Sequence, residues 1–141
     1  MSRLLADDAE SRLVNVTGTA DLTVTDDDTA IAMGSGAIRV FATPRMIALM
    51  EQAACEALSG QVPAGVTTVG VRVDVRHVAA CPVGAVVTAS ARVTGVDGDR
   101  ISFEVTATHL QGTLPVVIGT GTHLRVAVDA AAFVAGLDAK R

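Results

Sequence analysis

Apolar and polar residues alternate one by one along three stretches in the second half of the chain, residues 69–76, 87–94 and 101–108. Successive side chains of a β-strand point to opposite faces, so this period of two predicts three strands that each pack on one face. Residues 116–128 alternate less strictly but are rich in Val and Thr, and they predict a fourth strand. Residues 13–24 predict one more strand, ahead of the others.

Turn residues separate these strands. Residues 96–99 read Val-Asp-Gly-Asp, and an Asp-Gly pair between two alternating stretches is typical of a tight hairpin. Gly112 and Pro115 indicate a further turn before the last strand. We therefore expect the four later strands to follow one another in an antiparallel meander.

A helical period replaces the alternation over residues 43–58. Thr43 and Pro44 indicate an N-cap followed by proline at the first helical position, and Ser59-Gly60 ends the segment. The apolar positions recur at three- and four-residue intervals and are Met46, Ile47, Met50, Ala53, Ala54, Ala57 and Leu58. The pattern predicts one helix with a broad apolar face.

The remaining segments complete an α+β architecture. Residues 30–40 are apolar but interrupted by Gly34-Ser35-Gly36, which favours a loop or a broken strand over a helix. Residues 129–137 favour a short C-terminal helix, and the tail after it is expected to fray. One long helix packed on a curved antiparallel sheet is a two-layer arrangement, the hotdog fold. We expect a single hotdog domain over residues 1–141.

Composition and charge narrow the class of protein. The chain has no Trp or Tyr and only three Phe, so Val and Ala must fill the core, and its net charge of −4 counts against nucleic-acid binding. No stretch approaches the roughly 20 apolar residues of a membrane helix, and the N-terminus turns acidic at Asp7, too early for a signal peptide. Cys55 and Cys81 form no CxxC pattern, which predicts two reduced core thiols in a cytoplasmic protein.

Glu51 and His77 are the first candidates for chemistry. Glu51 falls at the border of the apolar helix face, where it is either a solvated acid or a carboxylate facing a pocket between helix and sheet. In the second case it would act as a general base or a nucleophile. His77 ends a predicted strand and shares the parity of its valines, so it points toward the helix unless a β-bulge reverses the strand. A half-buried structural histidine is the alternative.

Thr43 and two further histidines have less distinctive positions. Helix capping explains Thr43, although the amides of the same helix end would also suit a carbonyl oxygen or an oxyanion. Thr43 and Glu51 are separated by about 12 Å of helical rise, so the helix alone does not join them. His109 precedes a turn, which favours exposure, and His123 shares its strand face with glycines, which favours close packing. No motif indicates a metal or a cofactor.

Several short motifs together resemble the fluoroacetyl-CoA thioesterase family. The resemblance runs in order over about residues 38–128. The motifs are Phe41-Ala42-Thr43-Pro44, Leu49-Met50-Glu51, Ala54-Cys55, the segment from Gly70 to His77, Pro82-Val83-Gly84, Val96-Asp97-Gly98, and Gly119-Thr120-Gly121-Thr122-His123-Leu124-Arg125.

This resemblance implies a hotdog thioesterase that hydrolyses acyl-CoA. It implies a homodimer or a dimer of dimers, with acyl-CoA bound at the subunit interface. Thr43, Glu51 and His77 match the catalytic residues of the family, and Gly70 matches a glycine near the thioester carbonyl.

The arginines and the lid segment add two expectations to this resemblance. CoA is polyanionic, so arginines should line its path; Arg72, Arg76 and Arg125 are candidates, although each also fits an ordinary surface charge. Gly34 and Ala37 stand where the family carries the phenylalanines of its lid. We therefore expect thioester hydrolysis without fluoroacetyl specificity.

Two other functions compete with hydrolysis. One is a hotdog hydratase or dehydratase acting on enoyl or hydroxyacyl thioesters. Such enzymes usually pair an Asp with a His on the helix side, and the predicted helix has no His. The other is a non-catalytic module that binds acyl-CoA, because a fold alone does not establish an activity.

Overall fold

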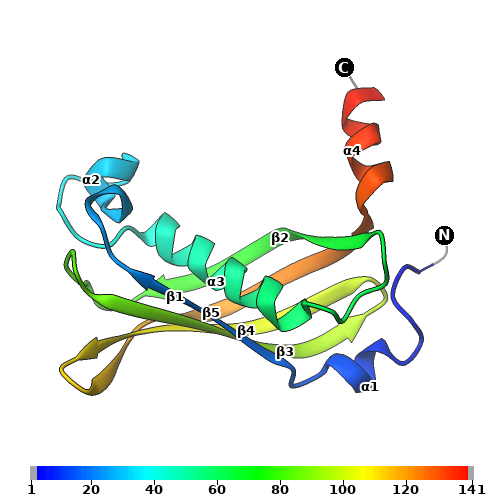
Figure 1. Ribbon diagram of the computed structural model, residues 1–141, viewed down its shortest axis with the longest axis horizontal. Coiled ribbons are helices and arrows are strands. Elements are labelled where there is room, and N and C mark those ends of the chain that lie inside the picture. Colours follow the sequence, from blue (N-terminus) through cyan, green and yellow to red (C-terminus); the bar gives the residue numbers. More distant parts are fainter. Residues whose placement is uncertain (1–2, 140–141) are drawn as a thin grey trace.

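The computed structural model describes residues 3–139 as a five-stranded antiparallel sheet crossed on one face by a long helix (Figure 1). The strands are β1 (Thr17–Thr23), β2 (Val66–His77), β3 (Val86–Asp97), β4 (Arg100–Gln111) and β5 (Leu114–Asp129). The helices are α1 (Ala9–Leu13), the 3₁₀ turn η1 (Asp26–Asp28), α2 (Ala30–Met33), α3 (Thr43–Leu58) and α4 (Ala130–Ala139). The predicted α+β arrangement, with one long helix on an antiparallel sheet, is confirmed.

The strand order in the sheet is β1-β3-β4-β5-β2. Strands β3, β4 and β5 form the predicted meander, and the hairpin at residues 96–99 joins β3 to β4. The prediction is wrong for β2, which pairs with β5 instead of β3. Strand β3 already has β1 on one side and β4 on the other, so β2 cannot join it and pairs with the outer side of β5. As a result β2 forms one edge of the sheet.

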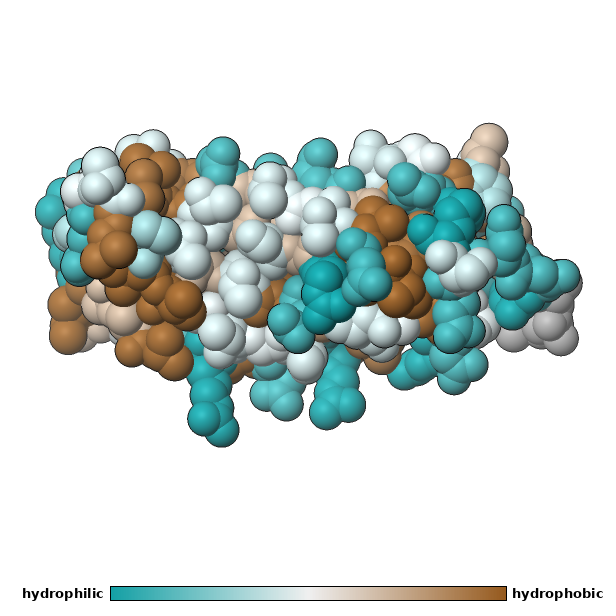
Figure 2. Space-filling view, turned by 90° about the horizontal axis from the view of Figure 1, so that it is seen from below, coloured by the Kyte–Doolittle hydropathy of each residue, from teal (hydrophilic) through white to brown (hydrophobic). Residues whose placement is uncertain are grey.

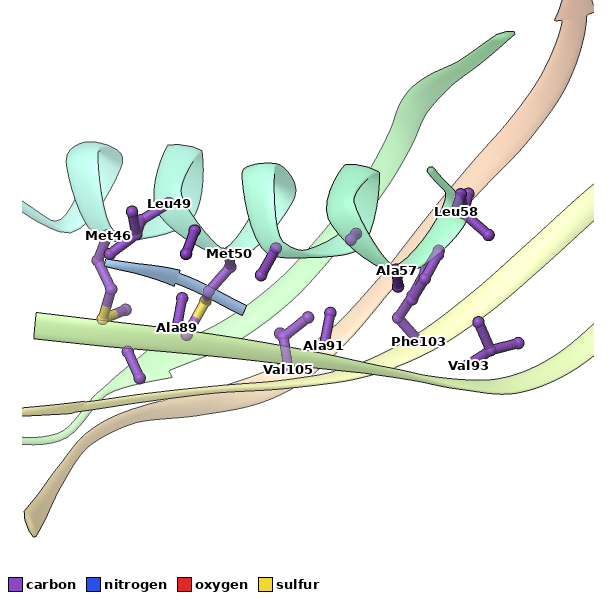
Figure 3. Close-up of a cluster of buried hydrophobic side chains, with 14 of the residues drawn as sticks. Met46, Leu49, Met50, Ala57, Leu58, Ala89, Ala91, Val93, Phe103 and Val105 are labelled. Carbon is purple, nitrogen blue, oxygen red and sulfur yellow. The ribbon is translucent and has the colours of Figure 1, made fainter. Parts of the chain in front are cut away.

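Small residues bring α3 close to the sheet (Figure 3). A Cβ atom on Gly18 of β1 would overlap backbone atoms of Ala53 and Ala57 in α3. A Cβ atom on Gly119 of β5 would lie 2.8 Å from the Cε of Met46 and 3.1 Å from that of Met50. The helix therefore packs nearly backbone to backbone on β1. Ala and Val supply much of the core, as the composition predicts, but its largest buried side chains are Phe, Leu, Met and Ile.

The segment before α3 differs from its prediction. Residues 13–24 begin not as a strand but with the end of α1, and β1 starts at Thr17. Residues 30–40 were expected to be a loop or a broken strand, yet they open with the single turn α2. Thr29 caps that turn by accepting a hydrogen bond from the amide of Ala32, and Gly34 ends it at a φ of 71°. These local bonds, and not a hydrophobic period, produce the turn.

Two expected burial states are also wrong. Cys55 is a free thiol as expected, but it is exposed, because it lies on the side of α3 that faces away from the sheet; Cys81 is free and buried. His109 is buried, because it continues the inward-facing positions Ile101 to Ala107 of β4. The predicted C-terminal helix is α4, whereas residues 140–141 of the expected frayed tail lie outside the described residues.

The sheet face away from α3 is mixed in character (Figure 2). Polar side chains cover much of it, and apolar side chains gather at the end where β4 turns into β5. Exposed apolar residues of that hairpin are Leu110, Leu114 and Val117. No helix among residues 3–139 is long and apolar enough to cross a membrane.

Candidate active site

Thr43 lies at the start of α3, hydrogen-bonded to His77 at the end of β2. Ala42 is extended and occupies the N-cap position, so the prediction that Thr43 is the cap is wrong. The amide of Ala42 donates to the carbonyl of Asp28, and this bond holds the residue before the helix in its extended form. The hydroxyl of Thr43 is thereby free to lie 2.8 Å from Nδ1 of His77.

His77 is placed between this hydroxyl and an aromatic ring. Phe41 meets the imidazole edge to face, with ring centroids 6.3 Å apart. Burial lowers the pKa of His77, and a hydrogen bond with the backbone of Ala79 opposes that shift. Its Nε2 atom is buried and has no hydrogen-bond partner among residues 3–139. His77 is therefore a neutral imidazole with one nitrogen committed to Thr43 and the other available for proton transfer.

A β-bulge at Val71 decides which residues of β2 face the helix. Pairing with β5 passes from Gly70–Arg125 to Arg72–Leu124, so Val71 is an extra residue in the strand. Gly70 and His77 are an odd number of residues apart and would lie on opposite faces of a regular strand. With the bulge between them, both face α3, since Gly70 lies against Glu51 and His77 against Thr43. The bulge precedes His77 and leaves its predicted direction unchanged.

A pocket of about 270 Å³ opens beside the Thr43–His77 pair. One wall is the lid segment, residues 30–40, which contributes Ala30, Ser35 and Val40. Phe41 and residues 78–80 line the rest together with the pair itself. The exposed Thr43 and the half-buried His77 thus border an open volume, an arrangement suited to a small organic group.

Glu51 lies two turns further along α3 and belongs to a second cluster. Its Oε2 is 3.3 Å from Nη1 of Arg125 and 3.8 Å from Nε2 of His123. A Cβ atom on Gly70 would overlap the same oxygen, so the glycine backbone lies directly beside the carboxylate. The side chain is 38% exposed. Glu51 is thus a partly open carboxylate held against the sheet by a cation, and not a solvated helix acid.

Arg125 was predicted either to line the path of CoA or to be an ordinary surface charge. The second alternative is wrong. The residue is buried, with its Nε 2.8 Å from the hydroxyl of Thr68 and its Nη2 3.0 Å from the carbonyl of Thr68. Arg72 and Arg76, by contrast, are exposed on edge strand β2. Of the three candidate arginines, only Arg125 contacts a predicted catalytic residue.

Sequence reasoning missed Thr68 and His123 as members of this cluster. The available signal was parity, because His123 and Arg125 are two residues apart on β5 and so share a face. The structure does not unite the predicted trio within one chain. Among residues 3–139, no hydrogen bond or ion pair links Glu51 to Thr43 or His77.

Comparisons with known sequences agree on one family. A family model described as "FlK: Fluoroacetyl-CoA-specific thioesterase" matches residues 24–131. A curated fluoroacetyl-CoA thioesterase of Streptantibioticus cattleyicolor is 37% identical over 89 residues, which amount to 63% of this chain and 61% of that protein. In this alignment the chain spans less than two thirds of its relative's length.

Solved structures agree on the fold. A structure of the fluoroacetyl-CoA thioesterase FlK is 31% identical, with a TM-score of 0.81 over 91% of this chain and 96% of that one. A Thermus thermophilus protein described as a thioesterase superfamily member is 25% identical, with a TM-score of 0.80 over 89% and 90% of the two chains. A hot-dog-like protein of Thermanaerovibrio acidaminovorans, 24% identical, has a TM-score of 0.82 over 96% and 97% of the two chains. The predicted hotdog fold is confirmed.

Proposed function

The chain belongs to the fluoroacetyl-CoA-specific thioesterase family, and from this premise we propose that it hydrolyses an acyl-CoA thioester to a free acid and CoA. The observation that carries the proposal is the pairing of Thr43 with the half-buried, neutral His77 beside a pocket. The carboxylate of Glu51, held by Arg125 next to the backbone of Gly70, is the second half of the machinery. Hydrolysis needs a base or nucleophile, a proton carrier and a polar contact for the carbonyl, and these residues supply all three.

In the proposed reaction, Glu51 starts ionised and His77 starts neutral. Glu51 either removes a proton from water as it attacks the carbonyl carbon, or attacks that carbon itself and forms an anhydride that water then cleaves. In both routes the carbon–sulfur bond breaks, and CoA leaves as a thiolate that receives a proton through His77. Thr43 hydrogen-bonds near the carbonyl, and the backbone of Gly70 approaches it because no side chain intervenes.

Two copies of the chain would bring the separated clusters together. Strand β2 is a sheet edge and exposes Val71 and Val73. If two β2 strands pair antiparallel around Asp74, with Val71 left unpaired as it is against β5, Gly70 of one protomer lies opposite the partner's His77, on the same face of the joined sheet. Each of two composite sites then combines Glu51 of one protomer with the Thr43–His77 pair of the other. The homodimer, or a dimer of dimers built from it, is therefore part of the proposal.

Mixed dimers test this assembly. We expect Glu51→Gln protein and His77→Ala protein each to retain only a small fraction of wild-type turnover alone, but each mixed dimer contains one site in which both residues are native. Random exchange of subunits makes half of the dimers mixed, so about a quarter of wild-type activity returns. If no activity returns although sedimentation shows that subunits exchange, the residues act within one chain. A sedimentation mass equal to one chain excludes the dimer.

The lining of the pocket indicates which acyl groups it can accept. The lid segment contributes Ala30, Ser35 and Val40 to the pocket and contains no aromatic residue. This wall of small side chains fits short acyl groups in general, and the aromatic ring of Phe41 belongs to the rest of the pocket lining, outside the lid segment. The test is a panel of acetyl-, fluoroacetyl-, propionyl-, butyryl- and enoyl-CoA, followed by a thiol reagent. Thiol release supports hydrolysis, whereas loss of enoyl absorbance without thiol release supports the hydratase, and calorimetric binding alone supports a binding module.

The pH dependence of turnover is expected to reflect the burial of His77. Because burial lowers its pKa, the imidazole stays neutral to a lower pH than an exposed histidine does. The decrease in kcat caused by protonation of His77 is therefore expected below about pH 6.5, the ordinary imidazole value. NMR titration of the His77 ring, assigned with a His77→Asn spectrum, gives its pKa independently of turnover. A His77 pKa at or above the ordinary value would contradict this prediction.

We also propose a cytoplasmic location. The two free cysteines, Cys55 and Cys81, support it, because thiols persist in a reducing compartment.

A further inference from the structure

His123 is the most buried titratable side chain in contact with the Glu51 cluster, and the proposed reaction does not use it. Its side chain is 1% exposed and belongs to β5, where it stacks on Phe103 of β4 with ring centroids 6.0 Å apart. Both ring nitrogens have polar neighbours. Nδ1 is 2.8 Å from the carbonyl oxygen of Arg72, and Nε2 is 3.2 Å from Nη1 of Arg125.

These two contacts fix the protonation of the ring. A carbonyl oxygen only accepts, so Nδ1 must carry the proton and donate it to Arg72. A guanidinium only donates, so Nε2 must be unprotonated and accept from Arg125. The neutral Nδ1–H tautomer satisfies both contacts, whereas an imidazolium would direct an N–H at a cation. Burial lowers the pKa of His123 and the neighbouring Arg125 adds to the effect, although the bond to Arg72 and the charge of Glu51 oppose it.

The β-bulge makes the acceptor available. Arg72 is the first paired residue after the extra residue Val71, at the point where the ladder between β2 and β5 is interrupted. Its carbonyl accepts from the side chain of His123, which lies on the neighbouring strand. The same bulge that lets Gly70 and His77 share a face therefore also sets the tautomer of His123.

Resting on the proposed function, we propose that His123 is a positioning residue for Glu51. Nη1 of Arg125 divides its donors between Nε2 of His123 and Oε2 of Glu51, while Thr68 holds the other two nitrogens of the guanidinium. Without an acceptor at His123, one donor of this buried group is unpaired and the guanidinium turns, taking Glu51 with it. His123 thus acts through Arg125 on the direction of the carboxylate, without contacting substrate.

Two amide variants separate this role from simple packing. In His123→Asn the amide falls near the position of Nδ1, so it keeps the bond to Arg72 but offers nothing to Arg125. In His123→Gln the amide oxygen reaches the position of Nε2 and restores the acceptor for Arg125. We expect His123→Asn to lower kcat by about 10- to 100-fold with KM within about twofold, and His123→Gln to recover most of that loss.

A double-mutant cycle with Arg125→Lys provides the decisive readout. Lysine keeps the positive charge but lacks the planar guanidinium with its several N–H donors, so His123 then has no guanidinium to orient. We expect His123→Asn to cause no further loss of kcat in the Arg125→Lys background. Equal losses for Asn and Gln, losses that follow the melting temperature, or full additivity with Arg125→Lys would each overturn the proposal.

Long-range proton–nitrogen NMR of the wild-type protein tests the tautomer without any substrate. The expected result is a neutral Nδ1–H ring at pH 7, and an Nε2–H ring or an imidazolium overturns the proposal. The kinetic measurements distinguish a failure of the proposed function from a failure of the proposed role of His123. If the wild-type protein releases no thiol from the acyl-CoA panel, the proposed function fails, whereas an active protein with a wild-type kcat in His123→Asn refutes only the role of His123.

Discussion

Replacing Glu51 with Gln is expected to lower kcat for acyl-CoA hydrolysis by about 10³-fold. Glutamine keeps the size and hydrogen-bonding reach of the side chain but has neither a basic nor a nucleophilic oxygen. The change removes the counter-charge of the buried Arg125, but the amide oxygen of Gln can still accept a hydrogen bond from its Nη1. Arg125 retains its bonds to Thr68 and His123, which keeps the fold of the variant intact.

Glu56→Gln is the matched control for this experiment. Glu56 lies on the same helix, is exposed, and forms no ion pair among residues 3–139. Both variants lose one negative charge from α3, so a general electrostatic effect on the anionic CoA would appear in both. Stopped-flow thiol release and thermal unfolding measure activity and fold together. Near-wild-type kcat in folded Glu51→Gln would remove Glu51 from the mechanism.

Gly70→Ala is expected to lower kcat by about 10²-fold while the protein still folds. The new Cβ would overlap Oε2 of Glu51 and lie 3.1 Å from the ring of His123 and 3.3 Å from Nη1 of Arg125. The overlap falls on the end of a flexible side chain, so Glu51 moves aside and the strand is retained. A displaced carboxylate is no longer aligned with the thioester carbonyl, and a small misplacement of a catalytic group lowers kcat by about this factor.

Gly95→Ala serves as the control for the glycine substitution. Gly95 belongs to β3, and a Cβ atom there would have no neighbouring heavy atom within 4 Å. The two variants share the same gain in backbone restriction but differ in what the methyl group meets. Kinetics of both variants measure kcat, and a crystal structure of Gly70→Ala should show a reoriented Glu51. A variant with unchanged kcat would mean that the position of Glu51 beside Gly70 does not matter for turnover.

Much of the fold follows from local patterns in the sequence. The alternation in residues 87–94 and 101–108 reflects strands with one packed face, and the helical period in residues 43–58 reflects α3, so both were predictable. The position of β2 was not, because which side of a sheet a strand joins depends on what its neighbours already occupy. The turn α2 also escaped prediction, since it depends on single capping bonds at Thr29 and Gly34.

The individual residues of the candidate site were predictable from the sequence, but their contacts with one another were not. Resemblance and parity pointed to Glu51 and His77, whereas helix capping by itself explained Thr43. The pairing of Thr43 with His77 depends on a one-residue shift in the helix start, which follows from a tertiary hydrogen bond at Ala42. The bond between Arg125 and Glu51 joins residues 74 positions apart, and no local pattern reports such a contact.

The close packing of α3 on the sheet has a consequence for motion. Gly18 lies against the C-terminal half of the helix and Gly119 against its N-terminal half, so the helix is fixed at both ends. A helix held this way cannot slide or rotate without steric overlap, and Thr43 and Glu51 keep a constant separation throughout turnover. Of the segments that line the pocket, residues 30–40 lie outside this tightly packed helix, and we expect the proposed acyl group to enter past them. Those residues touch the pocket from outside the core, so changes in them can alter which substrate enters without disturbing the groups that react.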